Sequence, residues 1–309
     1  MLEPLAADDP TYAGSYRLVE LLGAGGHARV FLGQDQSGRQ VAVRLFAEGT
    51  RFRPGHAAEL KAFQAAPTGL LDAGDDLGRP YLVGEYAHGE TLAARLGRQG
   101  TLEEAELRRT CGQTMDALAA AHGAGLAHGD LKPSKVLIAE DRIRLIGFGL
   151  ALVDVPAQGP YLSPEQARGG PGDLRSDLFS WACVMVEAGT GQRPFPAEGR
   201  AVLMTKPQLT GIAEPLKALF ASCLAKDPAL RPTAKEAAGA LADRPVAPEE
   251  RLPSGELLEL AEACADEQER AYDPARGLKV EELADLVAER DGPSRRIQAL
   301  RDRAHAAPV

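Results

Sequence analysis

The sequence predicts an α+β fold in which a small antiparallel sheet with one helix precedes a larger, helical part. Residues 14–46 alternate apolar and polar side chains between glycines, which is typical of short antiparallel strands. From about residue 91 onward, the apolar residues recur with the helical period. A sheet followed by a run of helices indicates a segregated α+β architecture and not alternating strand–helix units.

The elements of the sheet part follow from the same patterns. Strands are predicted where apolar residues alternate within short runs bounded by glycines, over residues 16–22, 29–33, 40–46 and 81–86. Between the third and fourth of these strands, the segment HAAELKAFQA at residues 56–65 has helical spacing and predicts one helix.

The helical part begins with a long amphipathic helix predicted over residues 103–124, where Leu107, Cys111 and Met115 share one face. Residues 174–190 are so apolar that they predict a buried helix. Two further helices are predicted over residues 213–225 and 233–242.

These patterns divide the chain into four segments. We expect an N-terminal tail at 1–13, the sheet part at 14–86, the helical part at 87–244 and an acidic helical extension at 245–309. A cluster of prolines near Pro245 predicts a linker before the extension. Between Glu249 and Asp291 there are 14 acidic and 5 basic residues. Two interpretations of this charge stay open: a solvated helical face, or a segment for docking or self-association.

Composition narrows the class of protein. The chain has 309 residues with a net charge of -9, so neither nucleic acid nor an anionic membrane surface is expected as a partner. The four cysteines form no C-x-x-C pair and have no histidine at metal-ligand spacing, which predicts buried thiols and no metal site. No run of apolar residues is long enough to span a membrane, and the N-terminus shows no signal-peptide pattern, so we expect a cytoplasmic protein.

One loop has the composition of a phosphate-binding turn. Gly23-Ala24-Gly25-Gly26 lies between two predicted strands, and glycines allow backbone N–H groups to approach phosphates closely. A simple hairpin turn would explain the same residues. A strand follows the loop where a dinucleotide-binding fold would have a helix, so that fold is not indicated.

Further motifs follow this loop in a fixed order, and together they are specific. They are Val41-Ala42-Val43-Arg44, a helix with Glu59, a strand ending at Glu85, His128-Gly129-Asp130-Leu131-Lys132-Pro133-Ser134-Lys135, Gly147-Phe148-Gly149, Tyr161-Leu162-Ser163-Pro164-Glu165, Ser176-Asp177 and Asp227-Pro228-Ala229-Leu230-Arg231. In this order they resemble the bacterial Ser/Thr protein kinase family across residues 14–244. The resemblance implies a two-lobed protein kinase-like fold, with a sheet lobe at 14–86 and a helical lobe at 87–244.

The residues that build this family's fold are retained. The resemblance implies a buried ion pair between Glu165 and Arg231, and a role for Asp177 in holding the catalytic loop. His128 and Phe148 match the apolar column that links the lobes. The expected nucleotide pocket comprises Gly23, Gly25, Val30, Ala42, Arg44, Glu59, Glu85 and Leu137.

The residues that perform the family's chemistry are changed. Arg44 stands where the family has a lysine that pairs with the helix glutamate, here Glu59, and arginine is bulkier and permanently charged. The two metal-ligand positions hold Gly147 and Lys135, so neither supplies the oxygen ligand that magnesium requires. The family's catalytic base and phosphate-contacting lysine remain as Asp130 and Lys132, which we interpret as vestigial.

The sequence therefore predicts a pseudokinase with little or no phosphate transfer, acting as a regulatory or scaffolding module for a protein partner in signalling. No metal and no cofactor are expected. Two alternatives stay open: a switch that binds ATP or another nucleotide without magnesium, and an atypical Ser/Thr kinase with residual activity through Asp130 and Lys132.

Overall fold

The computed structural model describes residues 3–139, 142–155, 158–170, 172–195 and 201–242. The chain divides into two units, Met1–Arg244 and Pro245–Val309, and all the described residues belong to the first. The acidic helical extension predicted at 245–309 lies outside the described residues.

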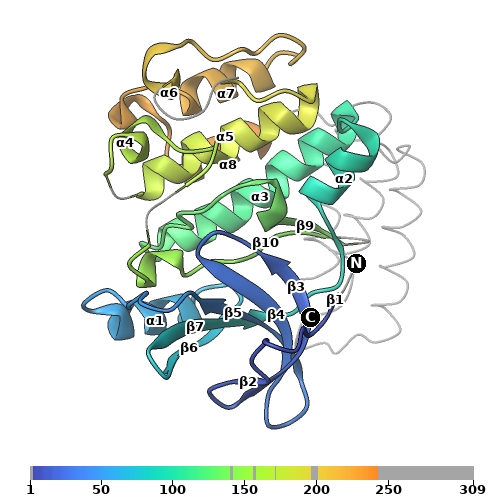
Figure 1. The fold of residues 1–309 in the computed structure, drawn as a ribbon. Helices are drawn as coiled ribbons and strands as arrows, with labels where there is room; N and C mark the ends of the chain where they lie inside the picture. The colour runs from blue at the N-terminus through green and yellow to red at the C-terminus, as the bar shows by residue number, and fades with distance from the viewer. Residues whose placement is uncertain (1–2, 140–141, 156–157, 171, 196–200, 243–309) are drawn as a thin grey trace, which may run out of the picture. The chain divides into compact units, whose positions relative to one another are not determined.

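An antiparallel sheet forms the N-terminal lobe (Figure 1). Its strands are β1 (Glu3–Pro4), β2 (Tyr12–Ala13), β3 (Tyr16–Ala24), β4 (Ala28–Gln34), β5 (Gln40–Phe46), β6 (Leu70–Asp76) and β7 (Arg79–Glu85). They are ordered β1-β3-β4-β5-β7-β6, and β2 pairs with β3. Alternate residues of β5 show why the sheet holds together: Val41, Val43 and Leu45 are buried and pack against Phe31 of β4.

Helix α1 (His56–Ala65) is the one helix that the described residues place within this lobe. It begins after Gly55, which has a φ of 86°, and Phe63 is its buried residue. The segment before α1 is tied to the helical lobe, because Arg53 N–H donates to the Leu152 carbonyl and Asp154 N–H donates to the Arg51 carbonyl, each at 2.8 Å.

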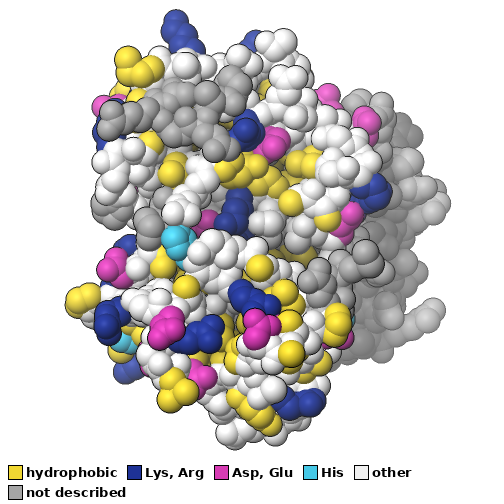
Figure 2. All heavy atoms as spheres, in the orientation of Figure 1, with side chains coloured by type: hydrophobic (Ala, Val, Ile, Leu, Met, Phe, Trp, Pro, Cys, Tyr) yellow, Lys and Arg dark blue, Asp and Glu magenta, His cyan; other side chains and the backbone are white. Residues whose placement is uncertain are grey.

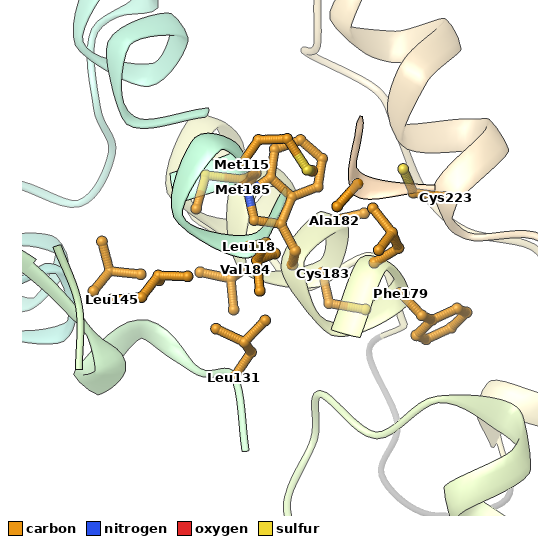
Figure 3. Close-up of a cluster of buried hydrophobic side chains, with 14 of the residues drawn as sticks. Met115, Leu118, Leu131, Leu145, Phe179, Ala182, Cys183, Val184, Met185 and Cys223 are labelled. Atoms are coloured by element: carbon orange, nitrogen blue, oxygen red, sulfur yellow. The ribbon is translucent and has the colours of Figure 1, made fainter. Parts of the chain in front are cut away.

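The C-terminal lobe is built around two long helices. Its α-helices are α2 (Leu92–Gln99), α3 (Glu104–Gly123), α4 (Pro164–Ala167), α5 (Leu174–Thr190), α6 (Ala201–Met204), α7 (Leu216–Cys223) and α8 (Ala234–Ala242), and short 3-10 turns are η1 (Pro133–Lys135), η2 (Leu150–Leu152) and η3 (Pro228–Leu230). Met115 and Leu118 of α3 pack with Val184 and Met185 of α5 in one apolar core (Figure 3). This core gives the loops that follow α3 a rigid support.

A second, three-stranded sheet positions the residues of interest. Strands β8 (Glu90–Thr91), β9 (Val136–Ile138) and β10 (Ile143–Leu145) are ordered β10-β9-β8. Val136 lies opposite Leu145 in the antiparallel pair. Lys135 immediately precedes β9 and Gly147 closely follows β10, so the pairing brings the two residues to the same end of the ribbon.

The α+β, two-lobed fold class predicted from the sequence is confirmed. The helices predicted at 56–65 and 174–190 have the predicted bounds, and the strand predicted at 81–86 instead spans Arg79–Glu85. Two features differ from the prediction. The expected tail at 1–13 contributes β1 and β2 to the sheet, and β6 was not predicted, because its sequence LLDAGDD is acidic and lacks β-branched residues.

Among the described residues, no helix has both the length and the apolar character that a membrane crossing requires.

Candidate functional site

The loop from His128 to Lys135 is fixed from below by a carboxylate of α5. Asp177 accepts hydrogen bonds from the backbone N–H of His128 at 2.6 Å and of Gly129 at 2.9 Å. His122 of α3 lies 2.9 Å from the same carboxylate. Gly129 has a φ of 77°, a conformation that glycine adopts without steric cost. These bonds hold the loop in the turn that places the next residue, Asp130, in the cleft.

His128 connects this loop to the segment after β10. Its ring nitrogen Nε2 donates to the Ile146 carbonyl at 3.1 Å, and Nδ1 accepts from the Asp130 N–H at 3.2 Å. The ring centroids of His128 and Phe148 are 4.6 Å apart. Burial lowers the pKa of His128 to about 4, so the ring is neutral and both bonds are satisfied by one tautomer.

Asp130 lies among basic side chains. Lys132 Nζ is 3.0 Å from Asp130 Oδ1, and Lys135 Nζ is 3.9 Å from Oδ2. Burial acts to raise the pKa of Asp130, but Lys135 and Lys132 outweigh it and the net shift is downward. The carboxylate is therefore charged at neutral pH and forms ion pairs with these two lysines.

Arg44 and Lys135 converge on Gly147. A Cβ atom added to Gly147 would lie 2.5 Å from Arg44 Nη2 and 3.2 Å from Lys135 Nζ. Arg44, on β5, is 9% exposed, and burial lowers its pKa against the opposing effect of Asp130. Gly147 has a φ of 86°, a backbone conformation that favours glycine. Both the backbone and the two adjacent cationic groups therefore disfavour a side chain at this position.

Lys135 is the most perturbed amine in the site. Its side chain is 13% exposed. Burial, together with the positive charges of Arg44 and Lys132, lowers its pKa to about 7, although Asp130 acts in the opposite direction. Figure 2 shows basic and acidic side chains next to each other at the level where the lobes meet.

Glu59 is not part of this cluster. It is exposed on α1, and no ion pair between Glu59 and Arg44 is present among the described residues. The pairing that the family resemblance implied is thus absent, because Arg44 points toward Asp130, Lys135 and Gly147 instead. The backbone link between Arg53 and Leu152, which the sequence did not reveal, fixes the segment leading into α1.

The other predicted pocket residues come from both lobes, with Leu137 on β9 of the helical lobe and the rest on the sheet lobe. Val30 and Ala42 are half-buried, and Leu137 is 5% exposed. Gly23 and Gly25 are exposed in the glycine loop. Glu85 lies at the rim, 3.4 Å from Arg39 and 3.8 Å from Arg144.

Gln158, in the segment between η2 and α4, approaches the glycine loop. A Cβ added to Gly26 would lie 3.5 Å from Gln158 Oε1, so Gln158 is in contact range of the loop that would cover phosphates.

The cluster does not fit a magnesium ion. Magnesium takes oxygen ligands in octahedral geometry, usually with one or more carboxylates. Here Asp130 supplies a carboxylate. The two positions expected to supply further oxygen ligands hold Lys135, an ammonium group, and Gly147, which the guanidinium of Arg44 approaches. Within the described ranges, no group of three or more His, Cys, Asp and Glu side chains is arranged to hold a metal ion. The local charge is positive where a metal would add more positive charge.

A cavity that sequence reasoning missed lies beside Lys132, between α2 and α5. Its volume is about 560 Å³, and its lining includes Leu96, Lys132, Tyr161 and Glu187. Tyr161 donates a hydrogen bond of 2.6 Å to Glu187. The two residues are 26 positions apart, so only the fold brings them together.

A sequence model of the protein kinase domain matches residues 16–240. The chain belongs to the protein kinase family. Two contacts that the resemblance implied are present in the helical lobe. Arg231, 2% exposed, lies 2.6 Å from Glu165. Asp177 accepts a hydrogen bond from the backbone of the catalytic loop.

Curated relatives are bacterial Ser/Thr protein kinases. The probable serine/threonine-protein kinase PkwA of Thermomonospora curvata is 34% identical over 261 residues, covering 76% of this chain and 35% of the relative. The serine/threonine-protein kinase AfsK of Streptomyces griseus is 34% identical, covering 74% of this chain and 31% of the relative. The chain thus spans about a third of the length of these relatives.

A solved structure shares the kinase fold. The crystal structure of Rad53 1–466 in complex with AMP-PNP superposes with a TM-score of 0.62 at 24% identity, covering 72% of this chain and 64% of that chain. At this identity the likeness establishes the fold alone.

Proposed function

We propose that this kinase-family chain is a pseudokinase that acts as a regulatory or scaffolding module for a protein partner. The observation that carries the proposal is the convergence of Arg44 Nη2 and Lys135 Nζ on the Cβ position of Gly147, at 2.5 and 3.2 Å. Phosphoryl transfer depends on positioning and on a metal that neutralises phosphate charge. Two cationic groups at this point disfavour a divalent cation and replace its oxygen ligands.

The arrangement of the sheet lobe supports the same proposal. Transfer in this family needs the β5 basic residue held by the helix glutamate, and here Glu59 is exposed and Arg44 faces Asp130. The framework of the helical lobe is intact, with Arg231 on Glu165 and Asp177 on the catalytic loop. A folded kinase domain without metal ligands and without the ion pair of the β5 basic residue can bind a partner protein but is not suited to phosphate transfer.

Phosphate transfer tests this proposal directly. Purified protein is incubated with Mg²⁺ or Mn²⁺, labelled ATP and a generic protein substrate, beside an Asp130→Ala variant. We expect equal, background incorporation in both, because the metal-binding residues are absent. Incorporation that disappears in Asp130→Ala would support the residual-kinase alternative and reject the pseudokinase.

A second candidate function is nucleotide binding without a metal. It is favoured by the three cationic side chains around one carboxylate, since Arg44, Lys132 and Lys135 surround Asp130 and leave positive charge for a polyphosphate. The approach of Gln158 to the glycine loop opposes it, because the side chain lies where the loop would cover phosphates.

Thermal unfolding with millimolar ATP, in EDTA or in Mg²⁺, separates the candidates, because a ligand that binds only the folded state raises the Tm. If nucleotide binds without a metal, ATP should raise the Tm at least as much in EDTA as in Mg²⁺. This rise in Tm should be smaller in Lys135→Gln. No rise in either condition rejects the nucleotide switch and leaves the pseudokinase proposal standing.

A further inference from the structure

Residues 3–13, which we call the N-terminal strap, are bound to the sheet along its third strand. Both short strands of the strap, β1 and β2, pair with β3 (Figure 1). Ala13 is 0% exposed and belongs to an apolar cluster that includes Phe31 of β4, and Leu5 packs against the same cluster. The strap is therefore part of the packed lobe.

This apolar cluster lies on the face of the sheet that points away from the cleft. Side chains alternate between the two faces along a strand. Arg44, which faces the cleft, lies opposite Val30 in the β4–β5 pair. Phe31 and Arg29 flank Val30 in β4, so both point to the other face. The strap and Arg29 therefore share the outer face of the sheet.

Asp9 joins the strap to Arg29. The Asp9 side chain is 1% exposed and forms an ion pair with Arg29, whose guanidinium also lies 5.2 Å from the centroid of the Phe31 ring. The Asp9 carboxylate also accepts a hydrogen bond of 2.8 Å from the Ala6 N–H within the strap. Removing the partner of a buried charge is strongly destabilising, so this ion pair fixes the strap against the start of β4.

Arg29 in turn lies at the point where the glycine loop meets β4. It belongs to the last residue pair of the β3–β4 register, directly before the loop. Two backbone hydrogen bonds close the loop next to it. Gly25 N–H donates to the Ala28 carbonyl at 2.9 Å. Ala47 N–H donates to the His27 carbonyl, also at 2.9 Å. Both acceptors lie within two residues of Arg29, so its position affects both bonds.

We propose that the N-terminal strap is a conformational control element that holds the glycine loop in place through the Asp9–Arg29 ion pair. Asp9 is a positioning residue, since it acts on the loop through Arg29. Displacement of the strap from the outer face would release the loop above the cleft, so the two faces of the sheet are coupled. The proposal goes beyond the proposed function, because it holds whether or not a nucleotide binds.

The test is amide hydrogen exchange in the full chain, resolved at single residues by NMR, in Asp9→Asn and Asp8→Asn. Asparagine at position 9 removes the charge but can still accept the bond from the Ala6 N–H. Asp8 is exposed in the same strap, so Asp8→Asn is the matched control for the lost charge. We expect exchange at Gly25 and Ala47 to rise at least about tenfold in Asp9→Asn and to stay unchanged in Asp8→Asn.

Arg29→Gln tests the other partner of the ion pair. It should raise exchange at the same two amides. Combining Asp9→Asn with Arg29→Gln should add little to either single change, because both remove one contact. Arg17→Gln is the control for Arg29→Gln, since Arg17 makes an exposed hydrogen bond to Gln34 at the far end of the same hairpin. Thermal melts establish that each variant is folded.

Three results would overturn the proposal. The first is unchanged exchange at Gly25 and Ala47 in folded Asp9→Asn. The second is an equal rise at Glu85, whose N–H donates to the Gly69 carbonyl elsewhere in the sheet, because the ion pair would then stabilise the whole lobe and not the loop. The third is additivity of the two variants, which would mean that they do not act through one contact. If Asp9→Asn does not fold, exchange in Arg29→Gln decides by the first two criteria.

Discussion

At the scale of single residues, Gly147 lies against two cationic side chains. The guanidinium of Arg44 and the amine of Lys135 lie where a side chain on residue 147 would begin. An aspartate placed at position 147 would therefore meet these two cations and a backbone φ of 86°. Arg44, Lys135 and Gly147 are thus in mutual contact and are interpreted together.

Gly147→Ala should be more destabilising than Gly129→Ala. Both glycines have positive φ, of 86° and 77°, so both variants incur a left-handed backbone cost of roughly 1–2 kcal/mol. Only at Gly147 does the added methyl group meet other atoms, because nothing lies within 4 Å of the Gly129 Cβ position. We expect an additional loss of about 1 kcal/mol at Gly147 in urea unfolding, from overpacking against Arg44 and Lys135.

The double variant Gly147→Ala with Arg44→Lys provides the control. A shorter cation should relieve part of the additional loss, giving a favourable coupling free energy in the mutant cycle. Equal destabilisation at the two glycines would contradict the close approach of Arg44.

At the scale of elements, α3 and α5 are joined by a buried polar contact inside their apolar interface. The Trp181 indole N–H donates to Thr114 Oγ1 at 2.9 Å, and the Trp181 ring also packs edge-on to Phe220 of α7. Thr114 in turn donates to the Thr110 carbonyl of its own helix. The contact fixes how the two helices are rotated against each other beneath the catalytic loop.

Thr114→Val should destabilise the helical lobe more than Thr110→Val. Both threonines are 0% exposed, and valine matches their shape. Thr110→Val removes only a bond from the hydroxyl to the Glu106 carbonyl, whereas Thr114→Val also leaves the buried indole N–H without its acceptor. We expect a difference of about 1–3 kcal/mol in the free energy of unfolding. Equal losses would mean that the indole finds another partner.

At the scale of the whole described unit, one ion pair joins segments that are 66 residues apart. Arg231 donates to both carboxylate oxygens of Glu165, at 2.6 and 2.8 Å, and Ser176 donates to the same group. Burial acts to raise the pKa of Glu165, but the bonds from Arg231 and Ser176 outweigh it and lower the pKa to about 2. The folded state therefore favours the charged carboxylate.

The acid stability of the protein should depend on this pair. The pKa of Glu165 falls on folding, so the charged carboxylate stabilises the folded state. This contribution is fully present above pH about 4.5, the pKa in the unfolded state, and is lost as the pH falls toward about 2. Glu165→Gln should lower the Tm at neutral pH, because it leaves Arg231 buried without its anion. It should also flatten the decline in Tm across this acidic range.

Glu104→Gln is the matched control, because Glu104 pairs with Arg108 on the exposed side of α3. It should leave the slope of Tm against pH nearly unchanged, since exposed pairs contribute little. If Glu165→Gln and wild type lose stability in parallel over the acidic range, the depressed pKa is wrong.

The sequence by itself determined the family framework and the residue types at the expected site. The ordered motifs, the helical period over 174–190 and the replacements at Arg44, Lys135 and Gly147 are all local properties of the chain. They predict most of the elements and the functional groups that are present, because the helical period and the ordered motifs can be identified from residue type and spacing. The acidic strand β6 and the short strands β1 and β2 escaped prediction, since pairing and not intrinsic preference places them in the sheet.

Only the tertiary structure decided which groups meet. The direction of Arg44 toward Gly147 instead of Glu59, the low pKa of Lys135 and the contact of Tyr161 with Glu187 depend on elements far apart in the chain. A side chain's direction follows the packing around it, and its pKa follows the water excluded and the charges gathered by that packing. These quantities belong to the assembled cleft and to no single segment of the sequence.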